Sequence, residues 1–291
     1  MAGWLAQRGA QPKPPGVRLE LSGPRLEASL ARLTAGCEAH GGIERYAQAV
    51  KLKSAMFRDA LGAAGEQSAE LEPETFKGLC TFMATVRRRV APWLERPHFD
   101  ALRDELARLS RVIGDTSNTD PALAAFGGGF ASGSPERWVR DLAAEILHNV
   151  APERFPLMNR WVWDAATNTG VIRELWFTDE RENARIEVPD TYATFLTLRE
   201  ELSGFLSGNG FFRDVIYYVD LLCAQVYAEY ICEQGGSYLR TDFSAEDDPL
   251  QYTRRLLGLD GVRPGTRRTR LKTIDGKAFV LADDSPHGLL D

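Results

Sequence analysis

The sequence has little of the chemistry that identifies a reaction. Its 291 residues include only four cysteines and four histidines, and no two cysteines form a CxxC pair. This spacing excludes a zinc knuckle, so we predict that the cysteines are reduced and act as small apolar residues. The phosphate-loop motif GxxxxGK[ST] is absent, and no Ser-His-Asp, Cys-His or dinucleotide-binding set can be assembled. We therefore predict no cofactor.

Long uninterrupted apolar runs are also missing. The opening segment MAGWLAQRGAQPKPPG has no apolar core of signal-peptide length, so we expect a cytoplasmic protein. The most apolar segment, 211–232, is interrupted by Arg213, Asp214, Asp220 and Glu229. It falls short of the ~20 apolar residues that a membrane span requires. As a helix, it would carry apolar residues on nearly every side. It predicts a buried central helix and no membrane partner.

What the sequence does contain is the composition of a globular protein, with 44% hydrophobic and 26% charged residues. Apolar residues recur at helical spacing through most of the chain, which predicts a mainly α fold. We expect an irregular N-terminal arm over 1–24, a single globular helical domain over 25–258, and a basic C-terminal appendage over 259–291. Within the domain, Val171–Phe177 and Arg185–Val188 have the pattern of two short strands, which predicts a small β-hairpin at about 171–188.

Positive charge is concentrated in two places. The run Arg87-Arg88-Arg89 lies late in a helix expected over 73–94, where it complements the helix dipole; it is either a solvated face or an anion site. Residues 253–277 carry a net charge of +6, against −6 for the whole chain and therefore −12 for the rest. An acidic body argues against a general nucleic-acid or membrane-surface binder. We expect the basic tail, with Arg267, Arg268 and Arg270, to fold back on acidic loops or to reach an acidic partner.

A central stretch, 134–176, holds four of the six tryptophans. Its segment 152–164 places arginines and polar groups among aromatic residues, which predicts a rigid binding surface for a partner. The alternative is structural: an ion pair four residues apart within one helix, and tryptophans that belong to the core. The candidate residues of this surface are Arg154, Asn159, Arg160, Trp161, Trp163 and Asp164.

The same segment resembles a turn of the type NPxxFPxxD found in helix-hairpin-helix DNA glycosylase-like proteins. The matching residues are Pro152, Phe155 and Pro156, and the likeness covers about fifteen residues. Asn159 stands where those proteins have an acid, and this acidic body lacks the basic groove usual among them. The resemblance implies a nucleic-acid-processing protein of helical architecture as an alternative function.

Two further patterns suggest chemistry. Glu145 and His148 lie three residues apart on one helix face, a pairing that di-iron helical bundles use to hold metal. Asp220 lies in the most apolar segment, where a carboxylate must be paired or neutral. It predicts either a salt bridge to an arginine or a general base. These patterns leave open whether the protein is an enzyme.

Taken together, the composition and motifs favour a cytoplasmic accessory or binding protein. It would engage a macromolecular partner, most simply another protein, through the aromatic, arginine-bearing surface and the basic tail. The alternatives are the nucleic-acid-processing protein and a metal-dependent helical enzyme.

Overall fold

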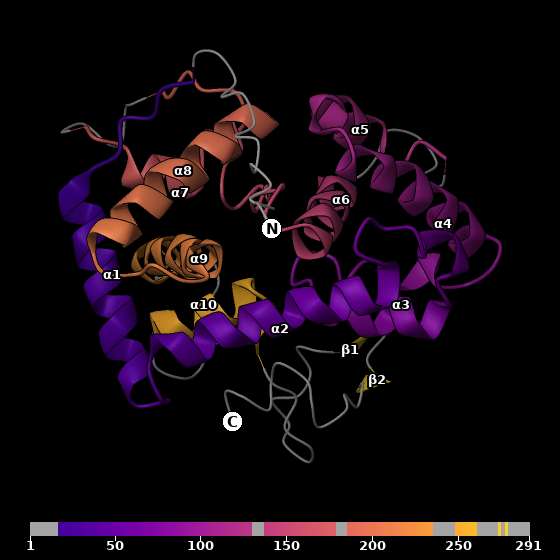
Figure 1. Ribbon diagram of the computed structural model, residues 1–291, viewed down its shortest axis with the longest axis horizontal. Coiled ribbons are helices and arrows are strands. Elements are labelled where there is room, and N and C mark those ends of the chain that lie inside the picture. The colour runs from indigo at the N-terminus through magenta and orange to yellow at the C-terminus, as the bar shows by residue number, and fades with distance from the viewer. Residues whose placement is uncertain are drawn as a thin grey trace, which may run out of the picture.

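The computed structural model confirms a mainly α protein (Figure 1). It describes residues 17–129, 137–178, 185–234 and 248–260, together with four strand residues near the C-terminus. The α-helices in these ranges are α1 (Gly23–Glu38), α2 (Ile43–Leu61), α3 (Pro73–Cys80), α4 (His98–Leu109), α5 (Thr119–Ala125), α6 (Arg137–Val150), α7 (Val171–Leu175), α8 (Tyr192–Gly208), α9 (Val215–Gln234) and α10 (Pro249–Leu256). Short 3-10 helices lie at η1 (Ser68–Glu70), η2 (Ala91–Trp93), η3 (Ser110–Ile113) and η4 (Thr116–Asn118).

Helix α9 is the central element. It packs against α1, α2, α7, α8 and α10, and Figure 1 shows it end-on with these helices around it. Its residues are apolar on every side, so burial of Leu221 and Leu222 removes large side chains from water on different faces of the helix. By length and composition Val215–Glu233 would also suffice to cross a membrane, but 61% of it is buried inside the protein, as in a core helix.

Helix α6 is buried along nearly its whole length. It packs mainly on α2, with further contacts to α4 and α5, and every residue from 141 to 150 is buried. Four of these residues are polar: Asp141, Glu145, His148 and Asn149. Because a buried polar group without a partner destabilises a fold, α6 requires hydrogen-bond partners inside the protein.

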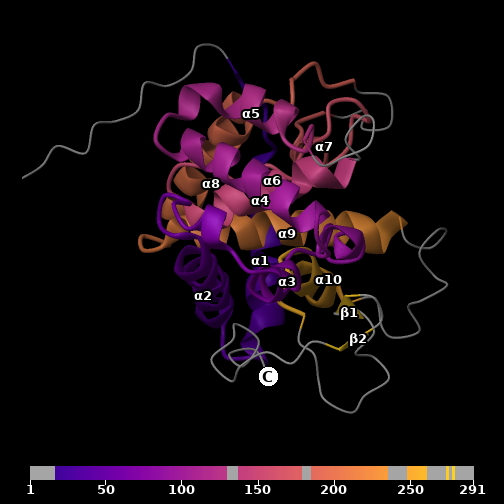
Figure 2. The same cartoon turned by 90° about the vertical axis from the view of Figure 1, so that its right-hand side faces the viewer.

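The two views in Figure 1 and Figure 2 place different helices at opposite ends of the body. Turning the view by 90° about the vertical axis keeps α3, α10 and both strands in its lower half and α5 and α8 in its upper half (Figure 2). Strand β1 (Thr273–Ile274) pairs antiparallel with β2 (Lys277–Ala278), on either side of Asp275-Gly276. The basic residues Arg267, Arg268 and Arg270 lie outside the described residues.

The β-hairpin predicted at about 171–188 is not confirmed. Val171–Leu175 forms the short helix α7, and residues 185–188 form no strand. Gly170 precedes α7 with a φ of 121°, and its Cα faces the Val162 carbonyl so closely that a Cβ would lie 2.7 Å from its oxygen. Val171, Ile172 and Leu175 then fall on one buried helical face. The extended pairing in this region is instead a bridge between Leu21 and Trp176.

The helix predicted over 73–94 is also shorter than expected. Helix α3 ends at Cys80, and the chain continues to residue 90 in successive turns. The Thr81 hydroxyl donates to the Gly78 carbonyl at 2.7 Å, a local bond that competes with the helical pattern. The arginine run 87–89 therefore lies beyond the last turn of α3, so the dipole explanation for it is wrong.

Both ends of the described body make contacts with it. Leu19 is buried, and the Ser22 amide donates to the Leu175 carbonyl at 2.8 Å. At the other end Leu259 is completely buried, and its amide donates to the Arg254 carbonyl at 2.7 Å. Residues 17–24 and 259–260, which lie just beyond the predicted boundaries of the domain, are thus in contact with the helices.

Candidate functional site

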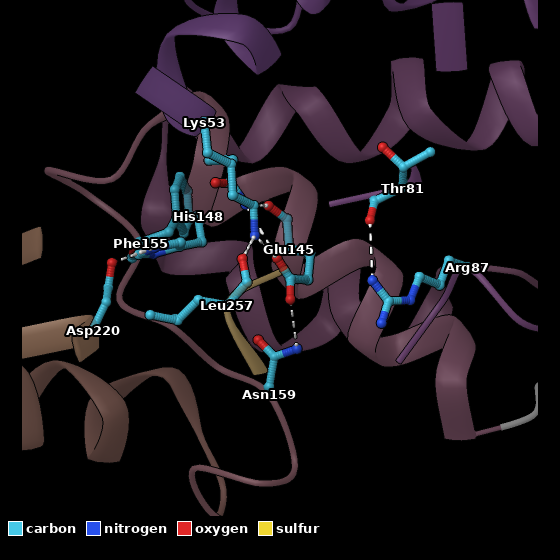
Figure 3. Close-up of polar contacts among 10 residues, drawn as sticks. Lys53, Thr81, Arg87, Glu145, His148, Phe155, Asn159, Asp220 and Leu257 are labelled. Carbon is cyan, nitrogen blue, oxygen red and sulfur yellow. Dashed lines mark hydrogen bonds and ion pairs between the residues drawn. The ribbon is translucent and has the colours of Figure 1, made fainter. Parts of the chain in front are cut away.

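Glu145 is the centre of a buried polar cluster (Figure 3). The Lys53 ammonium of α2 donates to Glu145 Oε2 at 3.1 Å and to the Leu257 carbonyl at 3.1 Å. Asn159 Nδ2 donates to Glu145 Oε1 at 3.2 Å, and Asn149 Nδ2 to Oε2 at the same distance. The carboxylate therefore has a cation and two amides inside the protein, which offset the cost of burying its charge.

The predicted metal pair does not form a site. Glu145 faces Lys53, whose ammonium takes the place that a metal cation would need, while His148 faces α9. Within the described ranges, no group of three or more His, Cys, Asp and Glu side chains is placed to hold a metal ion. The i, i+3 spacing is real, but tertiary contacts direct the two side chains to different partners.

His148 and Asp220 form a second buried pair. The His148 Nδ1 lies 2.9 Å from the Phe155 carbonyl, and Nε2 lies 3.0 Å from Asp220 Oδ2 (Figure 3). Asp220 is thus paired with a histidine, so the predicted arginine partner is wrong. Both ring nitrogens are within hydrogen-bond distance of protein oxygens, so neither is free to bind a substrate in this arrangement.

The surroundings of His148 act on its pKa in opposite directions. Burial disfavours the charged imidazolium, but the charge of Asp220 and the hydrogen bonds to Asp220 and Phe155 outweigh burial. The pKa of His148 therefore lies above its ordinary value.

Arg160 binds a buried carboxylate from another element. Its Nε and a terminal nitrogen donate to Asp141 Oδ2 at 3.2 and 2.8 Å, and its amide donates to Oδ1 at 3.2 Å. Asp164 is bound by Arg137 at 2.6 Å. The predicted ion pair between Arg160 and Asp164 within one helix is wrong, since residues 151–164 form turns and irregular structure.

The burial of Asp141 explains the structural role of Arg160. The Asp141 side chain is only 1% exposed, and burial raises its pKa even though hydrogen bonds and charge from Arg160 lower it. Arg160 thus supplies the hydrogen bonds that water would give an exposed carboxylate. Its role in the structure is that of a support for α6.

The aromatic residues of this stretch are core residues and not a surface. Trp163 is fully buried and its indole donates to the Val188 carbonyl at 2.9 Å; Asn159 is also fully buried. Trp161 is 7% exposed and packs on Tyr227, with ring centroids 5.8 Å apart. The Arg154 guanidinium donates to the Ile113 carbonyl, which closes the end of η3. The structural alternative for these tryptophans therefore holds.

The arginine run 87–89 contains both a buried and an exposed part. Arg87 is 2% exposed and its two terminal nitrogens donate to the two oxygens of Asp260 at 3.0 and 2.9 Å. The next two residues, Arg88 and Arg89, are exposed. Burial lowers the pKa of Arg255, and the positive charges of Arg87 and Arg88 act in the same direction. We call the exposed Arg88 and Arg89, together with the half-buried Arg255, the basic face.

The backbone that holds the basic face is tightly placed. Gly258 has a φ of 70°, and a Cβ there would lie 1.9 Å from the Phe82 carbonyl oxygen. Only glycine fits this approach. Leu259 and Asp260 follow directly, so the chain after α10 is fixed against the 81–90 turns. The sequence showed the arginine run, but not its pairing with a carboxylate 173 residues away.

A cavity of about 290 Å³ lies between α1, α7 and α9. Its best-placed polar group is Glu229, which accepts from Arg32 Nε at 2.8 Å, Ser29 Oγ at 2.8 Å and Gln225 Nε2 at 2.9 Å. These donors come from the protein itself and leave the carboxylate well satisfied.

No protein-family model, curated protein or solved structure matches this chain.

Proposed function

We propose that the chain is a cytoplasmic accessory protein that binds an acidic protein partner through its basic face and the basic sequence that follows Asp260. The observation that supports this is the anchored run Arg87–Arg89. One arginine is buried and paired, and its two neighbours project into solvent from a backbone held by Gly258, Leu259 and the Arg87–Asp260 pair. The aromatic surface predicted at 152–164 is left out because its tryptophans are buried.

Electrostatics explains why such a face would serve recognition. Surface arginines contribute little to folding, but the same groups can be worth ~2 kcal/mol or more when a partner desolvates them. Arg88 and Arg89 are adjacent in sequence, and the charge of Arg88, like that of Arg87, acts on Arg255. The positive fields of these arginines therefore add. The sequence from 261 to 277 extends this charge with Arg267, Arg268 and Arg270. An acidic protein surface complements it.

The test is a charge-reversal experiment. The double variant Arg88→Glu/Arg89→Glu is compared with Arg45→Glu/Arg111→Glu, which changes the net charge equally at exposed sites elsewhere. Nuclease-treated native lysate is passed over each immobilised protein, and the retained proteins are eluted with salt. We expect the wild type and the control to retain an acidic protein and the first variant to lose it, at an unchanged melting temperature.

Two outcomes contradict the proposal. Equal retention by the two double variants would remove the basic face from the interface. Retention that occurs only in a parallel lysate without nuclease treatment would favour a nucleic acid, and with it the alternative function.

A further inference from the structure

The His148–Asp220 pair has a proton requirement that follows from hydrogen-bond geometry alone. A carbonyl oxygen only accepts, so the 2.9 Å contact with Phe155 places a proton on Nδ1. A neutral imidazole carries one proton, and its Nε2 would then present a lone pair to Asp220 Oδ2 at 3.0 Å. An ionised carboxylate also only accepts. Two acceptors therefore face a ring that has one proton to donate.

One additional proton satisfies both contacts. It lies between Nε2 and Oδ2, whether it is written as imidazolium with carboxylate or as neutral imidazole with carboxylic acid, and the pair is then neutral overall. Both residues are buried, so water is not at hand to replace a broken contact. Loss of this proton to solvent costs one of the two hydrogen bonds.

We propose that the His148–Asp220 pair is a proton-dependent lock that ties the 151–155 turn to α9. The turn follows α6 directly, and its Phe155 carbonyl is held by His148 from within α6. When the proton leaves, the ring keeps its remaining proton for one acceptor: it releases either the Phe155 carbonyl or Asp220. The turn and α9 are then no longer joined through the imidazole.

The charged and titratable groups around the lock come from α2, α6, α8 and α9. Glu145 on the same helix is bound to Lys53 of α2. Burial raises the pKa of Cys223 and of Tyr217 on α9, so both remain protonated near neutral pH. From α8, Arg199 donates to the Pro152 carbonyl, and the Tyr192 hydroxyl donates to the Arg154 carbonyl. Burial raises the pKa of Tyr192 as well, which leaves His148 as the group that changes charge.

The direction of the pH effect follows from the sign of the shift. The pKa of His148 is raised in the folded protein above its ordinary value of 6.5. The lock is therefore fully closed below about pH 6.5, and its contribution is lost as pH rises through the folded-state pKa. Across that window one proton separates the two states, so the unfolding equilibrium constant rises by up to about tenfold per pH unit.

Asp220→Asn is the decisive variant. The introduced side-chain amide can donate to the Nε2 lone pair of a neutral ring while Nδ1 still donates to Phe155, so both contacts form without the additional proton. Urea unfolding between pH 6.5 and 9 should show a falling midpoint for the wild type and a flat one for Asp220→Asn. Asp59→Asn, which removes an exposed carboxylate of α2, should keep the wild-type slope. A common slope in all three proteins overturns the proposal.

A second measurement needs no variant. Nitrogen-15 NMR of the imidazole in the wild-type protein should show two protected protons at pH 6, one on Nδ1 and one in the Nε2–Oδ2 contact. One of them should disappear through the same pH window in which stability falls, and amide exchange at Arg154 and Phe155 should rise by more than the intrinsic increase with pH. A single protected proton at pH 6 contradicts the lock, even if Asp220→Asn does not fold.

Discussion

The charged residues around α6 differ from those of the basic face in their exposure to solvent. In the first region Lys53, Glu145 and Asp141 are enclosed by helices, and their partners are protein groups. In the second, one buried arginine holds the chain while its neighbours Arg88 and Arg89 meet solvent. Enclosed charges stabilise a particular arrangement, whereas exposed ones remain available to a partner.

This difference has an energetic cause. A charge that loses its partner inside the protein retains its full desolvation cost, because no water reaches it. A charge at the surface is hydrated when its partner is removed, and the loss is small. Removing one partner should therefore cost most where the remaining charge is enclosed, as at Glu145, and least where it is partly exposed, as at Asp260.

Lys53→Met should have the largest effect. It removes the cation from Glu145, whose side chain is 2% exposed, and should lower the free energy of unfolding by about 3–5 kcal/mol. Urea denaturation measures it. The paired variant Lys53→Met/Glu145→Gln removes both charges and should recover a large part of the loss. A loss below about 1 kcal/mol in the single variant would show that water reaches this centre.

Arg160→Ala should have an intermediate effect, about 2–3 kcal/mol at pH 7.5. Arg160 lowers the pKa of Asp141, which burial raises, so the variant raises that pKa further. A carboxyl with a raised folded-state pKa is favoured when protonated, and the deficit should therefore be smaller at pH 5 than at pH 7.5. Arg111→Ala, an exposed arginine, is the control. A deficit independent of pH would indicate that Asp141 is hydrated in the variant.

Arg87→Ala should have the smallest effect of the three, about 1–2 kcal/mol. Asp260 is 18% exposed, so water can replace part of what Arg87 provides. Arg87→Lys keeps the charge but not the two parallel hydrogen bonds, and it should recover less than half of the loss. Thermal and urea unfolding of the three proteins measure both values. A loss as large as that of Lys53→Met would mean that the basic face is part of the enclosed core.

Much of the helical framework could be predicted from local patterns. Apolar spacing predicted a mainly α fold and placed a helix over 211–232, within a few residues of α9, since apolar residues that recur every three to four positions fall on one side of a helix. The all-round apolar character of 211–232 indicated the buried central helix for the same reason. Helix α7 was mistaken for a strand because five residues are too few for either periodicity to dominate.

The partners of the polar side chains depended on contacts between distant parts of the chain. Lys53 meets Glu145 across 92 residues, His148 meets Asp220 across 72, and Arg87 meets Asp260 across 173. Sequence spacing pointed to other pairs, Glu145 with His148 and Arg160 with Asp164, that lie near each other only along the chain.

The sequence by itself thus determined that the protein is mainly α, that 211–232 forms a buried central helix, and that Asp220 required a partner, since these follow from local periodicity and from the cost of burying charge. Only the tertiary structure decided that this partner is His148, that the tryptophans of 161–163 face inward, and that Arg88 and Arg89 face outward. A hydrogen bond requires its two atoms to be about 3 Å apart, and the packing of separate helices brings them to that distance.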